Sequence, residues 1–570
     1  MKKIIFISFL IYANFCYSQG NASVNNSYPT NYFASPMDIP LVLSGTFAEL
    51  RSNHFHSGLD IKTQQREGIQ VFSSAEGYIS RIKISLWGFG KAIYITHPNG
   101  YTTVYAHLQK FSDRIENYIK QEQYKIENFE VEVFPTKDEL PVSKKELIAY
   151  SGRTGGFMGP HLHYEIRDTN TERTINPLYF GINISDTKKP SINTLVGYCM
   201  DGDSQINQVN APSQLTFVKS ENGDLIAKRI YAHGKIGFGI NTYDQLDAAT
   251  NHNGIYSLEL FVNGQKTHEF KATDFAFYET NLINLLIDYE RYQLINQRIQ
   301  KCFNEPKNNL SLTKNSLNNG IITIENNLNY TVDIIAKDFK GNEQKLTIPI
   351  TGKKAEIIGN NETVTTPFKI NHEEFNEFSS SYAKVAFPKN TFFNDFYLDF
   401  NVSDKIVKVH TPTIPLANNY TLTFDVSKYS EAEKNQLYIA SISEKGRKNY
   451  ENTIKKENTF YTSIKKLGKF TLLTDSEKPI ISLFNFKDNQ WLSNHTQLKV
   501  KILDRESGIK SFRGEIDGKW ILMEYDVTTG LLTYNFSEII YTEAKHNLKI
   551  VVIDNVGNLN TLEATFFRKK

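Results

Sequence analysis

The sequence predicts a mainly β fold, in which an N-terminal antiparallel-sheet domain is followed by about three β-sandwich domains. Most of the chain after the N-terminal region consists of short segments that alternate apolar and polar residues, separated by clusters of Asn, Asp, Gly and Lys. Several motifs in this part occur twice, which indicates repeated domains. The chain has 570 residues, too many for one hydrophobic core, and typical domain sizes divide it into about three to five domains.

The first residues, 1–18, have the pattern of a secretory signal peptide. Two lysines precede an apolar stretch of about a dozen residues, and the Cys-x-Ser sequence before Gln19 suits signal peptidase. The stretch is shorter than the roughly 20 residues of a membrane-spanning helix, and no comparable stretch follows. We therefore expect an exported chain without a transmembrane segment, located in the periplasm or outside the cell. Cys16 leaves lipidation as an alternative, although the residues before it depart from the usual lipobox.

The net charge of the chain argues against a nucleic-acid partner, and its cysteine content bears on disulfide formation. Removal of 1–18 takes two lysines and no acid from 64 basic and 62 acidic residues, so the mature chain is close to neutral. A basic excess would be expected of a nucleic-acid-binding protein, and we therefore expect no nucleic-acid partner. Cys199 and Cys302 remain, and the sequence leaves open whether they form a disulfide or stay free.

The repeats set the boundaries of the β-sandwich domains. The sequence DTKKPSINTL at Asp186 recurs as DSEKPIISLF at Asp475, and AKDFKGNEQKLTI at Ala336 recurs as VIDNVGNLNTLEA at Val552. Between them, a strand leading to Asn-Gly or Asp-Gly predicts a hairpin in each copy. Each repeat resembles a bacterial immunoglobulin-like β-sandwich. We predict such domains at 186–352 and 475–570, with a further β-rich domain, a sandwich by its strand pattern, at 353–474.

The remaining region, 30–185, holds six of the thirteen histidines. In the sequence GPHLHYEIR, strand alternation places His161, His163 and Glu165 on one face, while the apolar residues between them face a core. Further upstream, HFHSGLDIK puts His56 four residues before Asp60, with Gly58 between them to permit a tight turn. Two imidazoles and one carboxylate with an open fourth position form the ligand set of catalytic zinc.

A third segment, AIYITHPNGYTTVYAHL, predicts two strands joined by a hairpin at Pro98-Asn99-Gly100. Its return strand is expected to carry Tyr101, Thr103, Tyr105 and His107 on one face. Singly, each of these histidines is more readily explained by a structural role than by a metal or catalytic one. Their occurrence together in one domain favours a metal centre.

The combination of HSGLDI, YAHL, SGRTGG and GPHLHYEIR, over about residues 40–181, resembles the M23 family of zinc metallopeptidases, the group of lysostaphin and LytM-like peptidoglycan endopeptidases. The resemblance implies a compact antiparallel sheet with Zn²⁺ bound by His56, Asp60 and His163, and with His107 and His161 as catalytic histidines. It also implies hydrolysis of peptide cross-links in bacterial cell-wall peptidoglycan. Either catalytic histidine could act as the general base, with the other stabilising the oxyanion.

One segment departs from the family pattern, an insertion at about 109–140. Ser112 could cap a helix that turns Ile115, Tyr118 and Ile119 towards the sheet. The insertion could border the substrate groove or be a surface addition.

Two other functions compete with the enzyme. A non-catalytic LytM-like protein could bind the wall or activate another hydrolase, but such relatives typically lack ligands, whereas all five positions are filled here. A multi-domain adhesion protein would explain the β-sandwich domains, which could bind a protein partner, but not the histidines.

Overall fold

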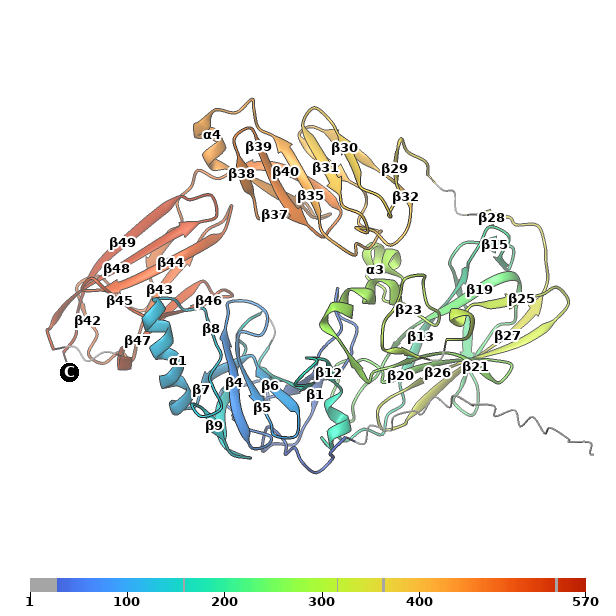
Figure 1. The fold of residues 1–570 in the computed structure, drawn as a ribbon, viewed down its shortest axis with the longest axis horizontal. Helices are drawn as coiled ribbons and strands as arrows, with labels where there is room; N and C mark the ends of the chain where they lie inside the picture. Colours follow the sequence, from blue (N-terminus) through green and yellow to red (C-terminus); the bar gives the residue numbers. More distant parts are fainter. Residues whose placement is uncertain (1–27, 157–158, 315, 361–363, 539–541, 570) are drawn as a thin grey trace, which may run out of the picture.

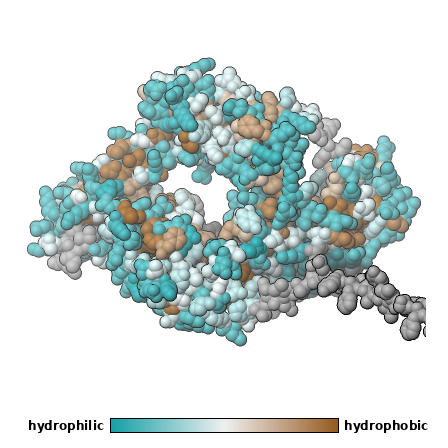
Figure 2. Space-filling model, in the orientation of Figure 1, coloured by the Kyte–Doolittle hydropathy of each residue, from teal (hydrophilic) through white to brown (hydrophobic). Residues whose placement is uncertain are grey.

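The structure is a computed structural model that describes residues 28–156, 159–314, 316–360, 364–538 and 542–569. The signal peptide predicted at 1–18 lies outside these residues. The fold is mainly β, with an antiparallel-sheet domain at the N-terminus and further β domains after it, as the sequence predicts (Figure 1). The domains follow one another around an opening that is visible in the space-filling view (Figure 2). No helix among the described residues is long and apolar enough to span a membrane.

The N-terminal domain is built on one antiparallel sheet with the strand order β1-β2-β11-β6-β5-β4-β8 and a small second sheet, β3-β10-β7. Apolar residues between these sheets form its core. The strands are β1 (Leu43–Gly45), β2 (Leu59–Lys62), β3 (Gln70–Phe72), β4 (Gly77–Ile84), β5 (Lys91–Thr96), β6 (Tyr101–Ala106), β7 (Leu108–Phe111), β8 (Val131–Val133), β9 (Pro141–Val142), β10 (Leu147–Ser151), β11 (His161–Asp168) and β12 (Thr174–Ile175).

The predicted alternation of β11 is present. Leu162, Tyr164 and Ile166 are fully buried in the core, while the histidines face the other side of the sheet. The hairpin predicted at Pro98-Asn99-Gly100 joins β5 and β6, and Gly100 adopts a φ of 84° that suits glycine. The central strands of the sheet therefore follow directly from the local sequence.

Besides strands β7 and β8, the insertion contains one helix, α1 (Asp113–Ile126), whose residues Ile115 and Ile119 are buried against the sheet while Tyr118 is half-buried. Ser112 occupies the N-cap position, but its side chain makes no capping hydrogen bond. The outer side of α1 contacts the last domain of the chain. Tyr124 packs edge-on against Trp520, with ring centroids 5.0 Å apart.

Further ion pairs connect the first and last domains of the molecule. Lys120 forms an ion pair with Glu538, and Arg513 forms one with Glu127 at the end of α1. Lys91, which is buried, forms an ion pair of 2.8 Å with Glu524. The insertion therefore serves as a docking surface for the C-terminal domain.

The domain that follows the N-terminal one has two packed β layers. Its main strands are β13 (Ser191–Cys199), β19 (Ile230–Tyr243), β20 (Ser257–Val262), β21 (Gln265–Lys271), β22 (Asp274–Phe275), β25 (Ile322–Ile324), β26 (Asn329–Lys337) and β27 (Glu343–Gly352), with the short helices α2 (Ile283–Leu286) and α3 (Tyr289–Ile295). Asn263-Gly264 turns β20 into β21 with positive φ at both residues, the hairpin predicted from the repeat. Both Cys199 and Cys302 are free thiols.

The two remaining regions have separate cores and paired sheets. Between 364 and 474, two five-stranded sheets contain β31 (Ala383–Phe387), β35 (Tyr420–Asp425), β39 (Thr459–Ile464), β34 (Ile406–Val409), β36 (Leu437–Ile442) and β40 (Gly468–Thr474), and α4 (Glu431–Gln436) precedes β36. After 475, a four-stranded and a five-stranded sheet contain β41 (Ile480–Leu483), β43 (Gln497–Leu503), β46 (Met523–Asp526), β47 (Leu531–Asn535), β44 (Ile509–Ile516), β48 (Lys545–Asp554) and β49 (Leu559–Phe567).

The N-terminal sheet is extended by the domain that follows it. Strand β22 pairs with β12, so that Phe275 lies opposite Thr174. Phe275 is fully buried, and its ring centroid lies 5.4 Å from that of Phe47 and 5.6 Å from that of Phe55. The backbone N–H of Phe55 donates to the Thr280 hydroxyl. The first two domains therefore share one hydrophobic core.

We expect a fragment of residues 19–181 to be less stable than one of residues 19–352. The shorter fragment exposes Phe47 and Phe55, and exposing a buried Phe costs about 1.5–3 kcal/mol. Thermal unfolding of the two fragments should therefore differ by several degrees, at roughly 2–4 °C per kcal/mol. Equal unfolding temperatures would show that the shared core contributes nothing to the N-terminal domain.

Candidate metal centre and catalytic histidines

Strand pairing brings two histidine-containing motifs of the N-terminal domain, HFHSGLDIK and GPHLHYEIR, together. In the antiparallel pair β2 and β11, Asp60 lies directly opposite His163. His56 precedes β2 and is held by two backbone hydrogen bonds, from its N–H to Glu49 O and from Ala48 N–H to its carbonyl. A Cβ on Gly58 would lie 2.3 Å from the carbonyl oxygen of Tyr164. Gly58 is therefore required for close approach of the backbones.

His56, Asp60 and His163 form a compact buried cluster. His56 Nε2 lies 3.0 Å from Asp60 Oδ1 and 3.0 Å from His163 Nδ1, and the last two atoms are also 3.0 Å apart. The three residues are 3–6% exposed. Ligand atoms at 2.0–2.1 Å from a tetrahedral zinc lie roughly 3.3 Å from one another. His56 Nε2, Asp60 Oδ1 and His163 Nδ1 would therefore bind zinc after moving slightly apart.

Hydrogen bonds on the far side of each residue fix its orientation. His56 Nδ1–H donates to Thr46 O at 2.8 Å, which leaves Nε2 directed at the cluster. His163 Nε2–H donates to Glu165 Oε1 at 2.8 Å, which leaves Nδ1 for the cluster. Arg51 donates to Asp60 Oδ2 at 3.0 Å, so Oδ1 is the oxygen turned towards the two imidazoles. Such partners set the tautomers that metal binding requires.

The charges of the cluster are adapted to a cation. Burial alone would raise the pKa of Asp60, but His56 and His163 hold it well below its ordinary value. Burial lowers the pKa of His163, but hydrogen bonds to Asp60 and Glu165 outweigh it and raise that pKa to about 9. Two carboxylates therefore favour positive charge at His163, which a divalent cation supplies as well as a proton does.

His161 and His107 lie beside the cluster. His161 Nε2 is 3.6 Å from Asp60 Oδ1, and its Nδ1–H donates to Gly159 O at 2.8 Å. His107 Nδ1–H donates to Thr154 O at 2.8 Å, and its ring centroid is 4.7 Å from that of His161. Burial and then the neighbouring histidines lower the pKa of His107 to about 3, and burial lowers that of His161. Both imidazoles are neutral at pH 7 and can accept a proton.

The strand face predicted for His107 was wrong. Strand β6 ends at Ala106, which lies opposite His163, and Tyr105 faces the core. Continued alternation would place His107 in the core beside Tyr105. His107 instead has a φ of 57°, and this left-handed backbone turns its side chain towards the histidines. The structure thus brings all five predicted site residues together.

Sequence reasoning did not assign a role to Glu165 and Arg167. Glu165 is fully buried, accepts from His163 through Oε1 and from Arg167 Nε through Oε2 at 2.6 Å. Arg167 also lies 4.4 Å from the ring centroid of Phe277, a residue of the following domain. The sequence of β11 already indicated a role for these two residues, because strand alternation places Glu165 and Arg167 on the same face as His161 and His163.

Replacing Glu165 with Gln should weaken metal binding by about 10- to 100-fold, because a neutral amide supports the His163 ligand less well than a carboxylate. Competition with a chelator measures this affinity independently of activity. Glu172→Gln is the matched control, since Glu172 also binds Arg167, at 3.1 Å, and is mostly exposed. Equal affinity in Glu165→Gln and the natural protein would contradict a supporting role for Glu165.

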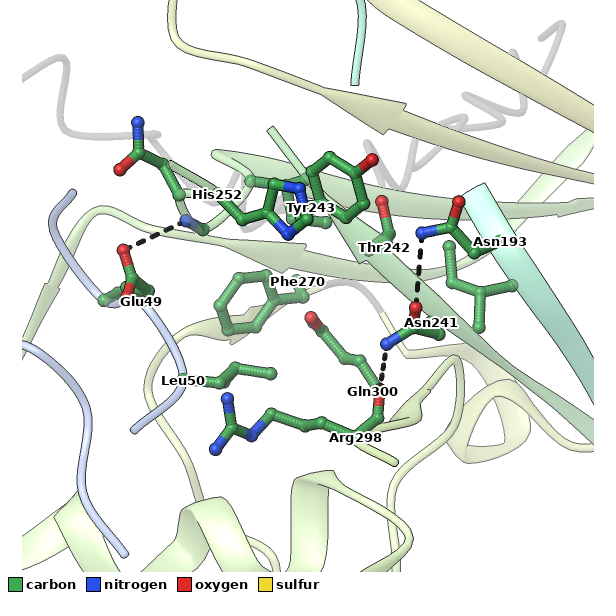
Figure 3. Close-up of a pocket in the computed structure, with 15 residues that line it drawn as sticks. Glu49, Leu50, Asn193, Asn241, Thr242, Tyr243, His252, Phe270, Arg298 and Gln300 are labelled. Carbon is green, nitrogen blue, oxygen red and sulfur yellow. Dashed lines mark hydrogen bonds between the residues drawn. The ribbon is translucent and has the colours of Figure 1, made fainter. Parts of the chain in front are cut away.

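A pocket of about 350 Å³ is lined by Glu49 and Leu50 of the N-terminal domain and by residues of the second domain (Figure 3). Glu49 accepts from the backbone of Gly254, and Asn241 links Asn193 to the carbonyl of Arg298, as the dashed lines show. None of the five site residues lines this pocket. The second domain thus supports the segment that carries His56.

A second pocket, of about 370 Å³, lies between the first and last domains. The N-terminal domain contributes Lys91, Gln109 and Thr154, and the C-terminal domain contributes Glu524 and Tyr525. Thr154 is the residue whose carbonyl accepts from His107. The C-terminal domain therefore borders the loop that positions one of the site histidines.

Comparison with known proteins finds two matching families and several similar proteins. Residues 54–124 match Peptidase family M23, and residues 366–475 match the Zu5-like domain. A DD-carboxypeptidase/endopeptidase Mpg of Neisseria meningitidis is 33% identical over 129 residues, which cover 23% of this chain and 23% of the relative. An uncharacterized metalloprotease of Haemophilus influenzae is 32% identical over 123 residues, which cover 22% and 20% of the two chains.

The chain thus spans less than a quarter of the length of these curated relatives. Among solved structures, the catalytic domain of lysostaphin from Staphylococcus simulans is 22% identical, with a TM-score of 0.18, over 25% of this chain and 90% of that chain. The matched residues include His56, Asp60 and His107. The N-terminal region of this chain is therefore a Peptidase family M23 domain.

Proposed function

We propose that the protein is a zinc-dependent endopeptidase that hydrolyses peptide cross-links of bacterial cell-wall peptidoglycan. The observation that carries the proposal is the buried cluster of His56, Asp60 and His163, with two neutral histidines beside it. The wall as substrate rests on the sequence resemblance to peptidoglycan endopeptidases. An exported location, in the periplasm or outside the cell, follows from the predicted signal peptide and belongs to the same proposal.

The five site residues have different roles in peptide hydrolysis. His56, Asp60 and His163 would hold the ion through Nε2, Oδ1 and Nδ1, the atoms that face one another. Zinc in such a site polarises the scissile carbonyl and activates the attacking water. His107 and His161 each direct Nδ1–H to a backbone carbonyl, so that their Nε2 atoms are free to accept a proton. One acts as general base, and the other stabilises the oxyanion or protonates the leaving amine.

The test is incubation of the purified mature chain with isolated peptidoglycan, followed by mass spectrometry of the released fragments. We expect new pairs of amino and carboxyl termini within the cross-links, no release after chelation, and recovery when zinc is restored. Intact cross-links after incubation with a zinc-loaded, folded chain would favour the alternative of a non-catalytic protein that binds the wall or activates another hydrolase.

A further inference from the structure

The second and the last domain each contain a cluster of three aspartates that the proposed catalysis does not use. The first cluster is Asp186, Asp244 and Asp338, and the second is Asp475, Asp504 and Asp554. In each, one oxygen atom from every carboxylate lies within 4.8 Å of the other two. Four of the six residues belong to the repeated sequences, at the starts DTKKP and DSEKP and at the ends DFKGN and DNVGN.

The two clusters have the same hydrogen-bond pattern around their first and third aspartates. Asn342 donates from its backbone N–H and from Nδ2 to Asp338, and Asn558 does the same to Asp554. Each of these amides also donates at 3.2 Å to the backbone carbonyl of the first aspartate, Asp186 or Asp475. Two copies of the domain have therefore kept one three-dimensional arrangement of carboxylates, although their remaining sequences differ.

Five of these six carboxylates are buried, and Asp504 is half-buried. Asp186, Asp244 and Asp338 are 9%, 3% and 3% exposed, and Asp475 and Asp554 are fully buried. Within the described parts of the chain, no Lys, Arg or His side chain forms an ion pair with any of the six. Lys340 comes near the first cluster, but its ammonium donates to Asn183. Uncompensated carboxylates are costly to bury, so the arrangement calls for a cation or a proton.

Each cluster lies beside a buried polar atom that has no hydrogen-bond partner among the described protein atoms. In the first cluster, Asp244 Oδ1 is buried and has no hydrogen-bond partner among the described protein atoms, and a cavity of about 20 Å³ borders Asp186 and Asp244. In the second, the hydroxyl of Ser507 is buried without a partner, while its backbone N–H donates to Asp475 Oδ2. A proton shared between two carboxylates would occupy one oxygen of each, and it would give the Ser507 hydroxyl no partner.

We propose that each cluster binds one Ca²⁺. Carboxylate and hydroxyl oxygens are hard ligands, which Ca²⁺ and not Zn²⁺ prefers, and Ca²⁺ accepts the irregular geometry that three separate chain segments provide. Extracellular modules typically bind Ca²⁺ with dissociation constants of about 10⁻⁴–10⁻³ M, which suits the exported location proposed above.

Both clusters lie close to the preceding domain, so a bound ion would help to hold neighbouring domains together. Asp186 begins the second domain, six residues after the 3₁₀ helix Pro177–Phe180 of the N-terminal domain, and it meets Asp244 and Asp338 of the same domain. Asp475 directly follows β40, and its N–H donates to Gln436 O in the preceding domain. Each Ca²⁺ therefore fixes a junction between domains, and the two together stiffen the chain where it curves around its central opening (Figure 1).

The test is equilibrium dialysis of the full mature chain against Ca²⁺, with bound metal measured by mass spectrometry. We expect two Ca²⁺ per chain, one in Asp244→Asn, one in Asp504→Asn and none in the double variant. Asp203→Asn and Glu563→Gln are matched controls in the same two domains, because both side chains are exposed, and they should still bind two. Zinc content should be unchanged throughout, which separates this proposal from that of the peptidase.

Thermal unfolding separates ion binding from a purely structural role. At about 10 mM Ca²⁺ the natural protein should unfold roughly 3–10 °C higher than in chelator, and the double variant should not respond. In chelator the variants should be at least as stable as the natural protein, since Asn removes repulsion between carboxylates. No bound Ca²⁺ in the natural protein, or variants equally destabilised with and without Ca²⁺, would overturn the proposal.

Discussion

Replacing His163 with alanine is expected to remove zinc from the protein and to reduce peptide cleavage to background. His163 supplies one of three ligand atoms and is held on its other side by Glu165, so its loss leaves a two-ligand site. Zinc content by mass spectrometry should fall from about one per chain to near zero. Alanine at His56 or Asp60 should give the same result, because each contributes one atom of the same cluster.

The control for these variants is His54→Ala. His54 lies two residues from His56, but its side chain is exposed and, among the described residues, hydrogen-bonds only to Asn53, so zinc and activity should be retained. Thermal unfolding distinguishes loss of the ion from loss of the fold. A His163→Ala protein that keeps zinc and cleaves the wall would overturn the ligand assignment.

Alanine at His107 or His161 is expected to leave zinc bound while cleavage falls by roughly two to four orders of magnitude, the usual contribution of a general acid or base. Both side chains hydrogen-bond to backbone carbonyls rather than to the three ligand atoms. Zinc binding should depend less on His107 than on His161, because His161 Nε2 lies 3.6 Å from the ligand atom Asp60 Oδ1. The measurement combines zinc content with initial rates on a soluble wall peptide.

The double variant His107→Ala/His161→Ala tests whether the two histidines act in one step. Groups that act as a unit give non-additive losses, so the double variant should be little slower than the worse single variant. Loss of zinc from both single variants would show instead that the two side chains belong to the ligand set. Unchanged rates in both would exclude them from proton transfer.

Much of the candidate site could be predicted because it depends on short-range regularities. Alternation alone places His161 and His163 on one face of β11 and Leu162 on the other, and the Pro98-Asn99-Gly100 turn determines the hairpin before β6. The left-handed backbone of His107 could not be predicted in this way. That conformation costs local energy, and contacts from Thr154, far along the chain, maintain it.

The sequence by itself determined the β class, since strand alternation is a property of neighbouring residues, and its repeats and its resemblance to a known family supplied the predicted domains and the five candidate site residues. Only the tertiary structure decided how the domains support one another. Phe275 completes the N-terminal core, α1 docks the last domain, and the three aspartates of each repeat meet across intervals of up to 152 residues, from Asp186 to Asp338. Such contacts depend on burial and charge complementarity between distant segments, which no local pattern encodes.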